Sequence, residues 1–164
     1  MKNLFSASLI RTALFLLPLT AGLLTTACKK TTKSDEEIIK EYLDTNKITN
    51  AQRQSSGLYY VPTLTDATQV QAVAGKTVSV LYTGMLMDGT VFDASAQHGN
   101  VPISFVLGRG KVIAGWDEGI ALMHKGDKAQ LLIPSALGYG SAGAPPSIPG
   151  DAVLRFQVEL VDVK

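Results

Sequence analysis

The sequence predicts an α+β fold, in which a curved antiparallel β-sheet wraps around one short α-helix, with a further short helix near the N-terminus. Two features indicate this architecture. From residue 57 onward, apolar and polar residues alternate with a period of two in several segments, which is typical of strands that bury one face. A helical period of apolar residues occurs in two places, one before these strands and one among them.

The composition is that of one globular domain with short appendages. The chain has 164 residues and a formal net charge of +1. It has no cluster of Lys and Arg that could follow a phosphate backbone, so we expect no binding of nucleic acid.

The N-terminal segment, residues 1–27, is predicted to be a secretory signal peptide. Basic residues precede an apolar run over residues 13–24, and small residues lead from there to Cys28. The run is shorter than the roughly 20 apolar residues that a membrane-spanning helix needs. We therefore leave this segment out of the predicted fold.

Cys28 is predicted to carry a lipid. The sequence Leu24-Thr25-Thr26-Ala27-Cys28 resembles a bacterial lipobox, in which the cysteine is acylated and becomes the mature N-terminus. It is the only cysteine, so it can form no internal disulfide. The resemblance implies a membrane-anchored lipoprotein outside the cytoplasm, in the periplasm or at the outer membrane. The alternative is an ordinary signal peptide with an incidental cysteine.

Residues 28–56 are predicted to form the lipidated tether and a short helix. Residues 29–33 are polar and have no periodicity, which indicates a tether. Ser34 and Glu37 match a capping box, so a helix should begin there and fade by Asn46. We expect it to pack on the domain rather than to mediate dimerisation. Its apolar face would consist of Ile38, Ile39, Tyr42 and Leu43.

The domain itself is predicted over residues 57–164. Asp88 and Gly89 indicate a tight turn that joins two strands in a hairpin. The later strands are expected to be antiparallel with one face in water. The clearest strand segments are residues 58–61, 77–86, 128–133 and 154–160.

The second helix is predicted around Trp116. Apolar or small residues recur at helical spacing as far as Met123, and Asp117 stands near the positive end of the helix dipole. Gly126 is expected to stop the helix. Residues 137–150 then form a loop rich in Gly and Pro.

Several classes of chemistry are disfavoured by the motifs that the sequence lacks. The two histidines, His98 and His124, are far apart and have no paired spacing, and no second cysteine is available for a metal site. No nucleophile elbow, P-loop or dinucleotide fingerprint is present. We therefore predict no metal and no cofactor.

A series of short motifs follows in the second part of the chain. They include VLYTGML at 80–86, DGTVFDAS at 88–95, VIAGWDEG at 112–119, GYG at 138–140 and FQVEL at 156–160. Together these motifs, in this order, resemble the FKBP-type peptidyl-prolyl cis-trans isomerases. The resemblance covers about residues 57–164.

The resemblance implies a hydrophobic pocket that encloses a prolyl ring. Tyr139 would donate a hydrogen bond to a substrate carbonyl, and the backbone N–H of Ile113 would hold another. Asp93 would lie beside the carbonyl of the twisting bond and interact with Tyr82, so the resemblance makes Asp93, Tyr139 and Tyr82 the catalytic residues. The implied substrate-binding residues are Phe92, Phe105, Val112, Ile113, Trp116, Ile148 and Phe156.

The residues by themselves leave plainer alternatives open. The aromatic side chains could be ordinary core residues. Asp93 could cap a turn, and Tyr139 could be an exposed loop residue.

The predicted function is acceleration of Xaa-Pro rotation in extracytoplasmic proteins by a monomer. An apolar pocket would desolvate the amide and favour its twisted form. The implied partners are proline-containing polypeptides and macrolide inhibitors. Ile103 stands where many family members have an aromatic residue, so we expect weaker macrolide binding. The alternatives are a non-catalytic chaperone or binding module on the same fold, or an envelope lipoprotein that only docks a partner.

Overall fold

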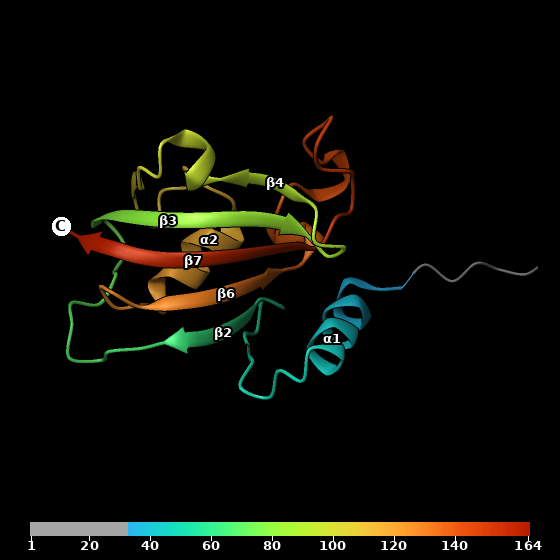
Figure 1. The fold of residues 1–164 in the computed structure, drawn as a ribbon, viewed down its shortest axis with the longest axis horizontal. Helices are drawn as coiled ribbons and strands as arrows, with labels where there is room; N and C mark the ends of the chain where they lie inside the picture. Colours follow the sequence, from blue (N-terminus) through green and yellow to red (C-terminus); the bar gives the residue numbers. More distant parts are fainter. Residues whose placement is uncertain (1–32) are drawn as a thin grey trace, which may run out of the picture. The chain divides into compact units, whose positions relative to one another are not determined.

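The structure, a computed structural model, describes residues 33–164. The predicted signal peptide, Cys28 and most of the predicted tether lie outside these residues. The described chain forms an antiparallel sheet that wraps around the helix α2 (Ala114–Ala121), with the helix α1 (Asp35–Thr45) near β2 (Figure 1). The predicted α+β fold class is therefore confirmed.

The sheet has seven strands in the order β1-β2-β6-β7-β3-β4, and β5 pairs with the free part of β3. All of the strand pairs are antiparallel. β7, which comes last in the chain, lies in the middle of the sheet between β6 and β3. The bounds are β1 Gln52–Arg53, β2 Tyr59–Leu64, β3 Thr77–Leu86, β4 Val91–Ala94, β5 Ile103–Val106, β6 Lys128–Ile133 and β7 Leu154–Val163.

The predicted hairpin joins β3 and β4. Gly89 takes a positive φ of 93°, which favours glycine, and its N–H donates to the carbonyl of Leu86. The Asp88 carboxylate accepts a hydrogen bond from the N–H of Thr90, which closes the turn. Three short 3-10 helices complete the described chain: η1 Ser95–His98, η2 Ser135–Leu137 and η3 Gly140–Ala142.

Helix α2 fills the concave side of the sheet because two glycines let it approach closely. A Cβ atom on Gly115 would lie 2.5 Å from Ile133, and one on Gly119 would lie 2.7 Å from Leu131. The helix ends at Ala121, so the prediction that Gly126 stops it is wrong. The N–H of the capping residue Leu122 bonds back to carbonyls within α2, and Gly126 belongs to the turn before β6.

Helix α1 packs on the outer face of the sheet, as predicted. The capping box is present: the Ser34 hydroxyl accepts from the N–H of Glu37, and the Glu37 carboxylate accepts from the N–H of Ser34. Ile39 and Leu43 are buried in a cluster that includes Leu132 of β6. The expectation that β6 has one face in water is therefore wrong, since only Lys128 of this strand is exposed.

Candidate functional site

A pocket of about 190 Å³ opens on the concave side of the sheet, beside the start of α2. Its walls come from strands β3, β4, β5 and β7, from helix α2 and from two loops. All three predicted catalytic residues line it. The lining residues are Tyr82, Phe92, Asp93, Ile103, Lys111, Val112, Ile113, Trp116, Tyr139 and Phe156.

The floor and walls of this pocket are aromatic rings in edge-to-face contact. The ring of Trp116 lies 5.2 Å from that of Tyr82 and 5.3 Å from that of Phe156, with interplanar angles of 77° and 83°. Phe92 meets Phe156 at 5.5 Å. These geometries are favourable for aromatic pairs, so the rings support one another and give the pocket a fixed shape.

The one carboxylate in the pocket, that of Asp93, has a hydrogen-bond partner on each oxygen. The Tyr82 hydroxyl donates to Oδ2 at 2.7 Å, and His98 Nε2 lies 2.8 Å from Oδ1. Burial raises the pKa of Asp93, but the bonds from Tyr82 and His98 outweigh it, so that this pKa falls below its ordinary value. Burial, with the bond to Asp93, raises the pKa of Tyr82 to about 12. At neutral pH, Asp93 is charged and Tyr82 is a neutral donor.

Asp93 therefore does not cap the hairpin turn, a task that Asp88 performs. His98 is a site residue that sequence reasoning missed. It stands five residues after Asp93, and η1 folds its ring back onto the carboxylate. Nothing in the sequence pattern indicates that the His98 ring contacts the Asp93 carboxylate.

Several hydrogen-bond donors at the pocket are free within residues 33–164, among them the buried indole N–H of Trp116 at its floor. The Tyr139 side chain is 41% exposed at the pocket mouth, and its hydroxyl has no partner in this part of the chain. The backbone N–H of Ile113, just before α2, donates to no group in the same range. A substrate that enters the pocket would therefore meet an aromatic interior, with the Tyr139 hydroxyl and the Ile113 N–H unused at its edge.

Two of the predicted substrate-binding residues lie behind the pocket rather than in its lining. Phe105 is 9% exposed and packs on Trp116 at 6.0 Å between ring centroids. Ile148 is buried in the main core, and its backbone pairs with that of Ala144. Both support the walls. Ile103 lines the pocket at the position where the resemblance placed a pocket residue, and Lys111 lines it although it was not predicted to.

Residues 68–161 match the family model described as FKBP-type peptidyl-prolyl cis-trans isomerase. The chain belongs to this family. The family and fold predicted from the sequence are thus confirmed. The family is one of peptidyl-prolyl cis-trans isomerases, which is the predicted enzyme class.

Relatives of this FKBP-type chain include proteins from plants, fungi and bacteria. The chain is 52% identical over 95 residues to peptidyl-prolyl cis-trans isomerase FKBP15-2 of Arabidopsis thaliana, and the aligned residues cover 58% of each protein. It is 54% identical over 93 residues to FK506-binding protein 2 of Yarrowia lipolytica, and the aligned residues cover 57% of this chain and 64% of that protein. The chain thus spans less than two thirds of both relatives.

A solved structure with a similar fold is that of FkpA from Escherichia coli. The TM-score is 0.69 and the sequence identity is 37%, over 80% of this chain and 59% of that one.

The loop that leads into α2 is fixed to the FKBP domain by Asp117. Its Oδ1 accepts from the N–H of Gly108 and its Oδ2 from the N–H of Gly110, both at 2.9 Å. Asp117 thus holds a neighbouring loop through both oxygens, where the sequence suggested only a favourable interaction with the dipole of its own helix. Since Val112 and Ile113 follow in the same loop, this clamp supports one side of the pocket.

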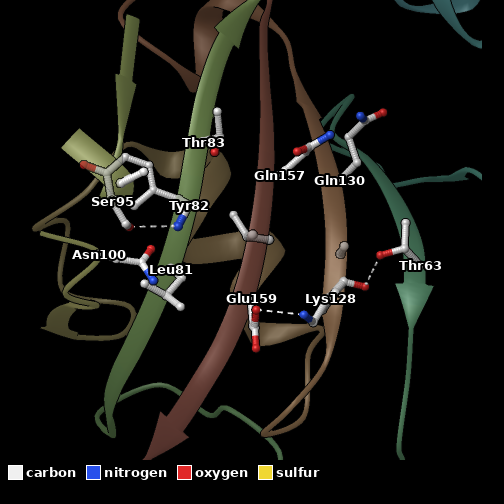
Figure 2. Close-up of a pocket in the computed structure, with 13 residues that line it drawn as sticks. Thr63, Leu81, Tyr82, Thr83, Ser95, Asn100, Lys128, Gln130, Gln157 and Glu159 are labelled. Atoms are coloured by element: carbon white, nitrogen blue, oxygen red, sulfur yellow. Dashed lines mark hydrogen bonds and ion pairs between the residues drawn. The ribbon is translucent and has the colours of Figure 1, made fainter. Parts of the chain in front are cut away.

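The FKBP domain has a second and larger hollow, of about 440 Å³, on the outer face of the sheet (Figure 2). Most of its lining residues are of polar types. Gln130 and Gln157 stand opposite each other on β6 and β7, and Lys128 forms an ion pair with Glu159 at 2.9 Å. No stack of aromatic rings lines it. An apolar prolyl ring fits the smaller pocket better.

Residues 33–164 contain no group of three or more metal-ligating side chains that could hold an ion. Within the same residues, no helix is both long and apolar enough to cross a membrane.

Proposed function

We propose that this protein accelerates the cis-trans rotation of Xaa-Pro bonds in polypeptides outside the cytoplasm. The observation that carries the proposal is the small pocket with edge-to-face aromatic walls and unused hydrogen-bond donors at its mouth. Family membership supports the same activity.

Rotation about the Xaa-Pro bond depends more on a desolvated pocket of complementary shape than on reactive side chains. Partial double-bond character of the C–N bond creates a barrier of about 18–20 kcal/mol to rotation. An apolar pocket disfavours the planar, charge-separated amide relative to the less polar twisted form, so that binding is strongest at the transition state. Burial of the prolyl ring against Trp116 supplies this environment.

The polar residues at the pocket would orient the substrate. The Tyr139 hydroxyl and the N–H of Ile113 would donate to substrate carbonyls on either side of the proline. Asp93, held by Tyr82 and His98, would lie beside the carbonyl of the twisting bond. No proton transfer or covalent intermediate is required.

The protein would act as a monomer anchored by a lipid on Cys28, in the periplasm or at the outer membrane. Residues 1–27 would be removed as a signal peptide, and residues 57–164 would be the isomerase domain. Replacement of Cys28 by serine should abolish incorporation of labelled palmitate in growing bacteria and release the protein from the membrane fraction. Labelling that persists in the variant would contradict the anchor.

Binding of FK506-like macrolides is a related proposal. The Yarrowia lipolytica relative is named for binding FK506. In this chain the pocket is lined by Ile103, which is 41% exposed and provides less contact area than an aromatic ring would. We therefore expect weaker binding than a pocket with an aromatic residue at this position would give.

The isomerase proposal is tested by the cis-to-trans rate of a short Xaa-Pro peptide with purified protein. Tyr139→Phe removes one hydrogen bond, worth about 0.5–1.5 kcal/mol, and should lower kcat/KM about 3- to 10-fold. Asp93→Ala should lower it at least as much. Matched controls are Tyr59→Phe and Asp88→Ala, which change the same residue types away from the pocket and should stay within about twofold of the wild type.

Lack of acceleration by the folded wild-type protein would refute the isomerase proposal. It would favour a binding module on the same fold, which grips apolar segments without catalysis.

A further inference from the structure

The first residue of α1 contacts a loop that lies far from it in the sequence. Asp35 Oδ2 accepts hydrogen bonds from both the N–H of Ser135, at 2.8 Å, and the Ser135 hydroxyl, at 2.7 Å. The two residues are separated by 100 positions. Ser135 opens the short helix η2, and the same loop carries Tyr139 to the mouth of the pocket.

Both backbone polar groups of Ser135 form hydrogen bonds. Its N–H donates to Asp35, and its carbonyl accepts from the N–H of Gly138 at 3.0 Å. Gly138 in turn lies close to Leu154: a Cβ atom on Gly138 would be only 3.0 Å from the leucine side chain. Tyr139 is the next residue. A continuous series of contacts therefore runs from the Asp35 carboxylate to the backbone of Tyr139.

Helix α1 gives Asp35 a firm base that does not depend on the loop. The capping box between Ser34 and Glu37 fixes the start of the helix, and Ile39 is fully buried on the sheet. The adjacent Glu36 bonds elsewhere, to Arg53 at 2.8 Å and to Lys40 at 2.9 Å. The two neighbouring carboxylates thus have separate partners, and only that of Asp35 reaches the loop with Tyr139.

We propose that Asp35 is a positioning residue for Tyr139: by holding Ser135, it fixes the turn that keeps the Tyr139 hydroxyl at the mouth of the pocket. Asp35 lies before the family-matched residues 68–161, so this support is supplied by the segment that precedes them. The inference rests on the proposed isomerase function, in which Tyr139 binds a substrate carbonyl.

The test compares kcat/KM on an Xaa-Pro peptide for a set of full-length variants. Asp35→Ala removes both bonds and should lower kcat/KM about 3- to 10-fold, as expected for loss of the Tyr139 hydrogen bond. Asp35→Asn keeps an acceptor oxygen and should retain at least half of the wild-type value. The matched control is Glu36→Ala, which removes a carboxylate and a tertiary contact from the same helical turn, and it should stay within twofold.

A double-mutant cycle separates positioning from a general loss of stability. If Asp35 acts through Tyr139, Asp35→Ala should have less than a twofold effect in the Tyr139→Phe background. Amide hydrogen exchange at Ser135 and Gly138 should accelerate in Asp35→Ala and remain unchanged in Glu36→Ala. Ser135→Ala, which removes only the hydroxyl, provides a milder variant with a smaller effect in the same direction.

Three results would overturn the proposal. The first is a normal kcat/KM in Asp35→Ala together with accelerated exchange at Ser135. The second is an equal loss in Glu36→Ala, and the third is an undiminished loss in the Tyr139→Phe background.

Failure of the isomerase function itself would be recognised separately, by a wild-type protein that is inactive. In that case tacrolimus affinity, followed by the fluorescence of Trp116, replaces kcat/KM in the same comparisons, and equal affinity of Asp35→Ala and the wild type overturns the proposal.

Discussion

Gly84→Ala should damage both the stability of the fold and the pocket. Gly84 lies on β3, opposite Asp93 on one neighbouring strand and Phe156 on the other. A Cβ atom at this position would lie 2.6 Å from the Phe92 ring and 2.7 Å from the Phe156 ring. Favourable contacts between carbon atoms need about 3.5–4.0 Å, so each ring would have to move by about 1 Å.

Two opposing effects set the size of the loss. Alanine in a strand is better than glycine by about 0.5–1 kcal/mol, because glycine loses more conformational freedom on folding. Overpacking of a close-packed interior costs about 1–3 kcal/mol, and here two aromatic rings are displaced together. We expect overpacking to win, with a net loss of about 1–2 kcal/mol in the free energy of unfolding. Since both rings are pocket walls, kcat/KM should also fall.

Urea unfolding measures this loss directly through the fluorescence of Trp116, the only tryptophan. Thr83→Ala is the matched control, because Thr83 is the adjacent residue on β3 and lines the hollow on the outer face. A Gly84→Ala variant as stable and as active as the wild type would refute the reasoning. It would mean that Phe92 and Phe156 are not held against the strand as described.

Three further predictions follow from contacts already described. The lowered pKa of Asp93 means that its carboxylate stabilises the fold above the ordinary Asp pKa of about 3.9, and that this contribution is lost as pH falls through the lower folded value. The difference in unfolding free energy between wild type and Asp93→Asn should shrink as pH falls below about 4; a difference that stays unchanged from there down to about 2 would contradict it. Ile39→Ala should cost about 2–5 kcal/mol in urea unfolding, because this side chain is fully buried, and an unchanged midpoint would show that α1 does not pack on the sheet. Asp117→Ala should accelerate amide exchange at Gly108 and Gly110 about tenfold or more; unchanged protection would mean that the loop is held by other contacts.

The sequence predicted those elements whose pattern is local. The bounds of β3 agree with the alternation over residues 77–86, because one face of this strand contributes Val78 and Val80 to the core. The start of α1 agrees with the capping box at Ser34, since such a cap depends only on residues within one turn.

Features that depend on contacts between distant segments could not be predicted in this way. The burial of Leu132 depends on α1, which covers the outer face of β6 at this residue and removes the expected alternation there. The bond between His98 and Asp93 depends on the path of η1. Phe105 and Ile148 lie behind the pocket for the same reason: the family's motifs identify the neighbourhood, but side-chain direction decides which residues reach the surface.

The central place of β7 determines the order in which the domain can form. β3 and β6 flank this strand and do not pair with each other, although both precede it in the chain. A nascent chain that has emerged only as far as β6 therefore has two unpaired strand edges and lacks one wall of the pocket. Long-range pairing of this kind makes folding slow compared with folding through local contacts. The domain can close only once residues 154–163 are available, so a chain that is still emerging from a ribosome stays open until its last strand arrives.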